Sequence, residues 1–208
     1  MIKNLYLVRH GETEFNEQGI IQGGGLDSPL TAKGVLQAER LASYLKNNNF
    51  IPEKILSSPQ ERAFNTARIL ASGLNIPIEL DNLLKEIDCG SFEGKLISSI
   101  DSEKLTRLRI SAKEKYPDGE SVEDVIERGS KLLQKFSSLQ LDSCLIISHG
   151  NFLRSFACAA TGMSSELAMK LYLDNTGFSY LFESGEYYRI SLWNSCTHFN
   201  SFPRKLKN

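Results

Sequence analysis

Short apolar runs alternate along this chain with segments whose apolar residues recur at helical spacing. The runs are rich in Leu, Ile, Val, Phe and Tyr, and they predict strands at residues 3–8, 54–57, 76–79, 143–147, 178–183 and 187–193. Apolar or small residues three and four positions apart predict helices within 38–45, 63–70 and 122–136. This alternation predicts a three-layer α/β/α domain with a mostly parallel central sheet, in which the last two runs supply an antiparallel strand.

Residues 95–120 interrupt the alternation with a long polar stretch rich in Lys and Arg. The stretch ends in a Pro-Asp-Gly turn signal at residues 117–119. We interpret it as a helical lid insertion. The alternative is a solvated helical excursion without a role, because charge runs usually form wet surface.

The composition is that of an ordinary folded domain, with 208 residues, 41% of them hydrophobic and 24% charged. We therefore expect one domain over residues 1–208. A net charge of −1 argues against a broad electrostatic grip on nucleic acid. Any anion must be bound by a local site.

The four cysteines, Cys89, Cys144, Cys158 and Cys196, are scattered without a C-x-x-C pair. They are typical of free thiols in a reducing compartment, and they suggest neither a zinc knuckle nor a redox motif. The N-terminus lacks the layout of a signal peptide, and no apolar run approaches membrane-spanning length. We expect a cytoplasmic protein with no membrane partner.

Residues suited to anion binding follow three of the predicted strands. The first strand ends in Arg9-His10-Gly11-Glu12, the second in SSPQER at 57–62, and the strand at 143–147 in SHGN at 148–151. Ligands of open α/β sheets bind at the carboxyl ends of the strands. If these strands are neighbours, two histidines and two arginines meet at one edge of the sheet and form an anion pocket.

The SSPQER stretch has a local logic of its own. Ser58 is predicted to cap the following helix, with Pro59 at the first helical position and Glu61 completing a capping box. Arg62 then falls in the first helical turn. The helix dipole favours an anion there, and a guanidinium adds a bidentate grip on phosphate oxygens.

Six ordered blocks carry a family resemblance: VRHGETEFN, DSPLTAKG, SSPQERAFNTA, LLKEIDCGSFEG, PDGES and ISHGNFLR. They resemble the signature blocks of the histidine phosphatase superfamily, in its phosphoglycerate-mutase-like branch. The resemblance implies that His10 is the nucleophile and forms a phosphohistidine that water hydrolyses. It also implies a phosphoryl clamp of Arg9, Asn16, Arg62 and His149, with Gly23 and Gly150 among the phosphate-binding positions.

A leaving alkoxide must be protonated, so a carboxylic acid is expected opposite the nucleophile. The resemblance implies that Glu86 is this proton donor. On the residues alone, Glu12, Asp88, Glu93 and Asp118 compete for the role, although capping or surface positions suit them better. The third histidine, His198, is expected to be structural or exposed.

The resemblance covers both phosphatases and cofactor-dependent mutases. The chain is shorter than the mutases, and it carries Cys89 and Ile97 where they carry a tyrosine and a lysine that hold a phosphoglycerate. We therefore expect a phosphatase of small phosphomonoesters, with a 2,3-bisphosphoglycerate-dependent phosphoglycerate mutase as the alternative. An inactive phospholigand-binding protein is the third reading, and the presence of every expected catalytic residue argues against it.

We expect no metal and no cofactor. Two of the three histidines are assigned to phosphate, and the sequence lacks a cluster of metal-ligand spacing. The Gly-rich QGGGLDS at 22–28 lacks the Gly-Lys-Ser/Thr ending of a nucleotide P-loop. Sugar phosphates, α-ribazole phosphate, phosphoserine and glycerate phosphates all fit the expected substrate class, and a homodimer is left open.

Overall fold

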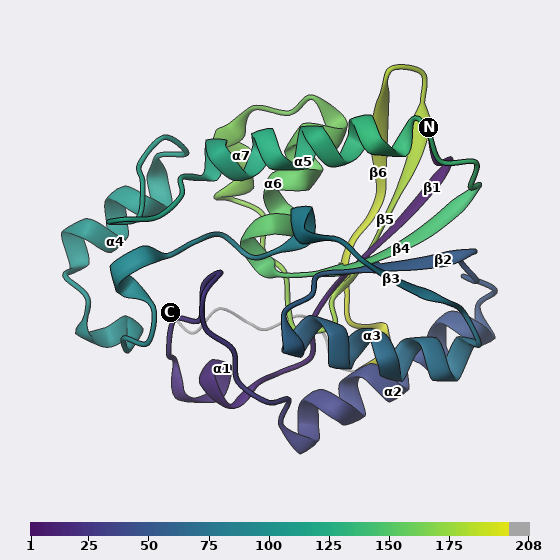
Figure 1. The fold of residues 1–208 in the computed structure, drawn as a ribbon, viewed down its shortest axis with the longest axis horizontal. Helices are drawn as coiled ribbons and strands as arrows, with labels where there is room; N and C mark the ends of the chain where they lie inside the picture. Colours follow the sequence, from purple (N-terminus) through teal and green to yellow (C-terminus); the bar gives the residue numbers. More distant parts are fainter. Residues whose placement is uncertain (200–208) are drawn as a thin grey trace.

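A six-stranded sheet forms the centre of the molecule (Figure 1). The computed structural model describes residues 1–199, and residues 200–208 of the expected domain lie outside that description. The strands are β1 (Asn4–Arg9), β2 (Lys54–Ser57), β3 (Ile78–Leu80), β4 (Ser143–Ser148), β5 (Phe178–Ser184) and β6 (Tyr187–Ser195). Their order is β3-β2-β4-β1-β5-β6, parallel from β3 to β1 and antiparallel at β5 and β6. The predicted sheet is confirmed.

Helices cover both faces of the sheet (Figure 1). α2 (Ala32–Asn47) and α3 (Glu61–Leu74) pack on one face, and α5 (Val122–Phe136) and α6 (Gly150–Thr161) on the other. Alternate side chains of a strand point to opposite faces. In β1, Leu5 therefore joins the core beneath α5 and α6, whereas Val8 joins the core beneath α2 and α3. The three predicted layers are confirmed.

The most completely buried strand is β4, which lies between β1 and β2. All of its residues are buried, as expected of a parallel strand covered on both faces. Arg9 at the end of β1 pairs with Ser148 at the end of β4, and Ser57 at the end of β2 pairs with Ile147. The segments that follow these three strands therefore leave the sheet at the same edge.

Shorter elements lie around this edge. They are α1 (Glu14–Gln18), α4 (Ser102–Ile110), α7 (Ser165–Ala168) and the 3₁₀ turns η1 (Asn82–Leu84), η2 (Gly90–Phe92), η3 (Ile97–Ser99) and η4 (Thr197–Phe199). The predicted helical insertion at 95–120 is present as η3 and α4, and Figure 1 shows α4 set apart from the three layers. Within residues 1–199, none of the helices has the length and apolar character needed to cross a membrane.

Candidate active site

The sequence-predicted residues converge on one cavity at this edge of the sheet. The cavity has a volume of about 330 Å³, and its lining includes Arg9, His10, Asn16, Gly23, Arg62 and Glu86. His149 lies beside His10, with their ring centroids 5.2 Å apart. Gly150 instead borders the Arg9 side chain, since a Cβ built on it would lie 3.6 Å from Arg9 Nε. The two histidines and two arginines that follow the strands do meet.

His10 is held in one orientation by its own backbone. Its Nδ1 lies 2.8 Å from the carbonyl oxygen of Gly11, and the Gly11 amide donates to Thr66 Oγ1 at 3.0 Å. A carbonyl only accepts hydrogen bonds, so Nδ1 carries the proton and Nε2 keeps its lone pair. The ring is buried, and burial together with the cations of Arg62 and Arg9 lowers the pKa of His10 well below its ordinary value. The imidazole is therefore neutral.

Arg62 is a fully buried arginine held by a loop distant in sequence. Its Nη1 donates to Leu26 O at 2.8 Å and pairs with Asp27 Oδ1 at 2.9 Å, while its Nη2 donates to Gly23 O at 2.8 Å. Gly23 has a positive φ of 57°, and a Cβ there would collide with Glu93. The Gly23 carbonyl can therefore support Arg62 only because this position has no side chain.

The predicted capping box of α3 is wrong. The helix begins at Glu61 with Gln60 as N-cap, and the N-cap side chain forms no capping hydrogen bond. Asp27 replaces it, because its carboxylate accepts from the backbone amides of Glu61 and, at 3.3 Å, Arg62. The N-terminus of α3 does attract an anion, as its dipole predicts, and that anion is a side chain of the protein itself.

Ser58 does not cap α3 and instead forms a hydrogen bond with His149. Its Oγ lies 2.9 Å from His149 Nε2 and accepts from the Gln60 amide at 3.3 Å. His149 is completely buried, and burial with the nearby cation of Arg62 as the next contribution lowers its pKa well below the ordinary value. This ring is also neutral and presents Nδ1 on the side opposite Ser58.

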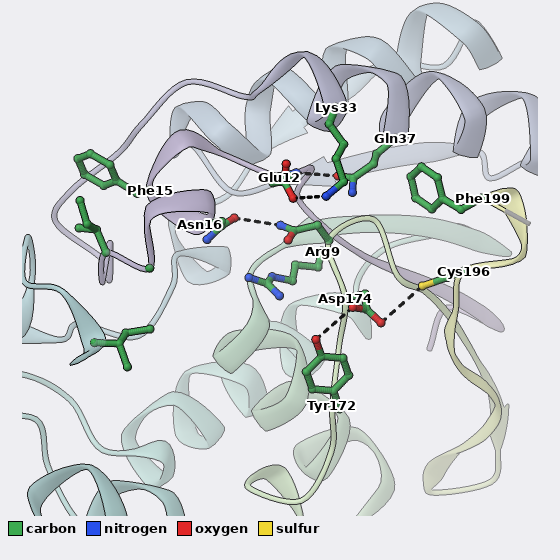
Figure 2. Close-up of a pocket in the computed structure, with 14 residues that line it drawn as sticks. Arg9, Glu12, Phe15, Asn16, Lys33, Gln37, Tyr172, Asp174, Cys196 and Phe199 are labelled. Carbon is green, nitrogen blue, oxygen red and sulfur yellow. Dashed lines mark hydrogen bonds and ion pairs between the residues drawn. The ribbon is translucent and has the colours of Figure 1, made fainter. Parts of the chain in front are cut away.

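Asn16 is oriented by a residue that the sequence analysis did not identify, Asn175. The Asn175 Nδ2 donates to His10 O and to Asn16 Oδ1, both at 3.1 Å. Figure 2 shows the bond to Asn16 as a dashed line beside the Arg9 guanidinium. Because the Asn16 oxygen is occupied, its Nδ2 amide is the group left to face an anion. Arg9 is anchored from the other side, through Nη1 to Leu173 O at 2.8 Å.

Three buried nitrogen atoms around His10 have no hydrogen-bond partner within the described residues. They are Arg9 Nε, Arg62 Nε and His149 Nδ1. Buried polar atoms are normally paired, because leaving a donor unpaired costs about 1–3 kcal/mol. Their gathering around one imidazole, two of them on cations, indicates a site built for an anion that accepts several hydrogen bonds.

Glu86 faces this group from a loop outside the regular elements. Its Oε1 accepts from the backbone amides of Ile87 at 2.9 Å and Phe152 at 3.0 Å, and its Oε2 accepts only from Asn151 at 3.2 Å. Two of these amides belong to the first turn of α6. Glu86 therefore occupies the N-terminus of α6 as Asp27 occupies that of α3, and Oε2 accepts fewer hydrogen bonds than Oε1.

The rest of the wall comes largely from the insertion and from α6. Cys89 and Ile97, which stand where mutases of the family are expected to carry polar groups, both line the cavity. Other lining residues that sequence reasoning missed include Leu105, Leu108, Arg109, Tyr116, Asn151, Arg154 and Met169. The thiol of Cys89 is buried, which raises its pKa above the ordinary range. It is therefore an apolar wall at neutral pH.

The competing carboxylates have structural contacts. Glu12 pairs with Lys33 at a second, neighbouring cavity of about 510 Å³ (Figure 2). Glu93 accepts from the amides of Gly25 and Cys89, and Asp88 from the amide of Gly90 at 2.7 Å. Asp118 lies in the turn with a positive φ of 61°. In the described part of the chain, no group of three or more His, Cys, Asp or Glu residues is placed to hold a metal ion.

Comparison with known proteins places this geometry in a family. Residues 5–196 match the model of the histidine phosphatase superfamily, branch 1. The chain is 36% identical over 202 residues to "Putative phosphoserine phosphatase 2" of Hydrogenobacter thermophilus, covering 95% of this chain and 98% of that one. It is 34% identical over 194 residues to "Probable phosphoglycerate mutase GpmB" of Shigella boydii, covering 91% and 86%.

Solved structures agree on the fold. The mycobacterial glucosyl-3-phosphoglycerate phosphatase in complex with VO3 superposes with a TM-score of 0.86 at 25% identity, covering 93% of this chain and 99% of that one.

Proposed function

Because the chain belongs to branch 1 of the histidine phosphatase superfamily, we propose that it is a metal-independent phosphatase that hydrolyses small phosphomonoesters through a phosphohistidine at His10. One observation carries the residue assignment. Arg9 and Arg62 line the same cavity as His10, His149 lies beside it, and each of the three has a buried nitrogen without a partner, while His10 Nε2 keeps its lone pair. A phosphoryl group bound there meets both the nucleophile and the donors that its oxygens need.

The proposed reaction has two steps. His10 Nε2 attacks phosphorus, the ester P–O bond breaks, and the departing oxygen takes a proton from Glu86 Oε2. In the second step the Glu86 carboxylate takes a proton from water, whose oxygen attacks phosphorus and breaks the P–N bond. Inorganic phosphate leaves, and both side chains return to their starting state.

The positive groups stabilise charge on the phosphoryl oxygens in both steps. Arg9 and Arg62 neutralise these oxygens, and the amide of Asn16 and the Nδ1 side of His149 add hydrogen bonds. The donors are already fixed by Leu173 O, Asp27, Asn175 and Ser58, so the site needs little reorganisation when charge develops. Gly23 acts here through its carbonyl, which fixes Arg62.

Hydrolysis is favoured over mutase activity by the wall of the cavity. A mutase must hold the dephosphorylated intermediate until it is phosphorylated again, which needs polar groups on the far end of the substrate. Cys89 and Ile97 offer none at the two positions where the family resemblance expects them, and the polar side chains of the wall, among them Tyr116 and Arg154, stand at other positions. The relative named as a mutase keeps that activity as the second candidate.

A direct assay separates the two activities. The protein is given 3-phosphoglycerate with catalytic 2,3-bisphosphoglycerate, and both 2-phosphoglycerate and free phosphate are followed beside a panel of phosphoserine, hexose phosphates and α-ribazole phosphate. We expect phosphate release from at least one monoester to exceed interconversion, before and after prolonged treatment with EDTA. Faster interconversion with no comparable hydrolysis would establish the mutase, and activity restored only by a metal would refute metal independence.

The four cysteines are free and buried, and they agree with a reducing cytoplasmic location, which we also propose. Whether the protein forms a homodimer is measured by light scattering.

A further inference from the structure

We infer that Arg128 is a positioning residue for the proton donor Glu86, acting on both the loop that carries Glu86 and the helix that receives its carboxylate. This inference rests on the proposed function, in which Glu86 protonates the leaving group. Arg128 lies on α5, and only 16% of its side chain is exposed. It does not line the cavity, and its hydrogen bonds go to the segment that carries Glu86 and to Glu120.

The loop before Glu86 has carbonyl groups that no regular element satisfies. The Arg128 Nη1 donates to Leu83 O at 2.9 Å and Lys85 O at 2.6 Å, and its Nη2 donates to Glu86 O at 3.4 Å. The remaining carbonyl, Leu84 O, accepts from Ser148 Oγ at 2.6 Å. The guanidinium thus satisfies the carbonyls of this segment as a neighbouring strand would, and three of its four hydrogen bonds end within the four residues 83–86.

The same guanidinium also contacts the helix end that receives the carboxylate. Its Cζ lies 5.3 Å from the ring centroid of Phe152, a cation–π distance. The backbone amide of Phe152 is one of the donors to Glu86 Oε1. Arg128 therefore fixes Glu86 at its main chain and packs against the residue that binds its side chain.

Glu120 completes the arrangement. Its Oε2 pairs with Arg128 Nη2 and accepts from the Asp88 amide, both at 2.9 Å. The carboxylate compensates the charge of a largely buried arginine and ties residue 88, just beyond Glu86, to the same point. Both sides of the Glu86 segment are thereby joined to α5 through one ion pair. Because removing one partner of such a pair leaves the other uncompensated, Glu120 is expected to matter through Arg128.

Proton transfer depends steeply on placement, and a shift of about 1 Å in a catalytic group can cost on the order of a hundredfold in rate. Loss of Arg128 should therefore weaken proton donation while leaving His10 and the phosphoryl clamp in place. The need for a donated proton depends on how basic the leaving oxygen is. An alkyl phosphate needs it, whereas p-nitrophenyl phosphate does not.

The test measures kcat/KM for p-nitrophenyl phosphate and for the fastest alkyl phosphate among phosphoserine, 3-phosphoglycerate and a hexose phosphate. Their ratio is compared in wild-type protein, Arg128→Met, Arg128→Lys and Glu120→Gln. Lys131→Met is the matched control, since it removes a cation from the exposed face of the same helix. The ratio does not depend on the folded fraction, because unfolding lowers both rates equally.

We expect Arg128→Met to change the ratio about tenfold or more against the alkyl ester, Arg128→Lys and Glu120→Gln to change it less, and Lys131→Met to leave it unchanged. Combining Arg128→Met with Glu86→Gln should add little to the effect of Glu86→Gln alone. If Arg128→Met does not fold, the two milder variants decide. An unchanged ratio in the folded Arg128 and Glu120 variants, while Glu86→Gln changes it, would overturn the inference alone. An unchanged ratio in Glu86→Gln would instead overturn the proposed role of Glu86.

Discussion

The Nδ1 atom of His10 lies 2.8 Å from the carbonyl oxygen of Gly11, and in the proposed mechanism this contact leaves Nε2 as the nitrogen that attacks phosphorus. Because Nδ1 donates its proton to the carbonyl, only Nε2 has a free lone pair. We predict that protein quenched during turnover contains phosphate on His10 Nε2, acid-labile and stable to base. Phosphorus NMR, or antibodies specific for each phosphohistidine isomer, shows which of the two ring nitrogens carries the phosphate.

His10→Ala should carry no such phosphate and should not turn over. Equal labelling of this variant, or phosphate found on Nδ1, would contradict the assignment.

Glu86→Gln should slow alkyl phosphates by about a hundredfold or more and p-nitrophenyl phosphate far less, because general acid catalysis contributes roughly 10²- to 10⁴-fold where the leaving group is basic. The substitution should also reduce stability by about 1–3 kcal/mol, since an amide nitrogen cannot accept from the α6 amides that bind the carboxylate. Steady-state kinetics and chemical denaturation measure the two effects.

Glu93→Gln is the control for this experiment. Glu93 is also a carboxylate that accepts from backbone amides, and it does not line the active-site cavity. It should lose stability without any change in the ratio of the two substrates. Equal slowing of both substrates by Glu86→Gln would point to a positioning role.

The layers of the fold could be predicted from local patterns, because the buried positions of each strand and helix recur as apolar residues within that element. The strand at 143–147 is recognisable since all of its residues are apolar or small and sit between two other strands. The helix at 150–161 was not predicted, although its buried face is apolar. Its opening Gly150-Asn151 resembles a loop, and its first turn is completed by Glu86, 65 residues away.

The candidate site likewise has a part that could be predicted from local sequence and a part that could not. Most of the residues proposed to bind phosphate follow strand ends, and they could be predicted from that placement and from the family resemblance. The residues that orient them could not, because their contacts join distant segments: Asp27 with Arg62, Ser58 with His149, and Asn175 with Asn16. Asn175 lies just before β5, next to β1 in the sheet and far from it in the sequence. In a sequence without a known topology, such an asparagine resembles any other turn residue.

The ion pair between Asp27 and Arg62 should contribute to the reaction, although loss of Asp27 should cost less than loss of the arginine itself. Arg62→Ala should reduce kcat/KM by about 3 kcal/mol in transition-state stabilisation or more, which is over a hundredfold. Asp27→Ala should lower it at least tenfold, because the guanidinium loses its charged partner and α3 loses the acceptor of its first amides. Loss of the Asp27 carboxylate as the cap of α3 should also reduce the free energy of unfolding by about 1 kcal/mol.

Glu53→Ala is the matched control for Asp27→Ala. Glu53 Oε1 also accepts two backbone amides, those of Asp142 and Ser143, at the opposite end of β4. Both variants should show a similar shift in denaturation midpoint, and only Asp27→Ala should lose activity. Full activity in a folded Asp27→Ala protein would show that Arg62 is held well enough by the carbonyls of Gly23 and Leu26.

Acid stability gives a prediction for the third histidine. His198 Nε2 lies 3.0 Å from Thr176 Oγ1, whose own proton goes to Asn175 O, so the imidazole is the donor. Burial, with the cation of Arg40 as a smaller cause, lowers the pKa of His198 to about 4 from the ordinary 6.5. His198 is therefore a neutral, structural histidine that contacts Thr176, whose backbone amide donates to Arg9 O.

Between pH 6.5 and about 4, the unfolded chain binds a proton at His198 that the folded chain does not. The free energy of unfolding should therefore fall as the pH falls through this window, by at most about 1.4 kcal/mol per pH unit from this residue. His10 and His149 act in the same direction, because their pKa values are also lowered in the folded state. Both histidines are present in wild-type protein and in a His198 variant, so their contribution cancels when the two proteins are compared.

His198→Gln retains a donor for Thr176 and removes the titrating group, so its unfolding free energy should depend less steeply on pH between 4 and 6.5. Urea denaturation of both proteins at half-unit steps of pH measures this slope, and above pH 7 the two curves should run parallel. The variant should bring the largest gain relative to wild type at the acid end, because the wild-type protein there has lost most of what its neutral imidazole contributes. Curves that stay parallel throughout this window would mean that His198 is solvated in the folded protein and takes up its proton as readily as the unfolded chain does.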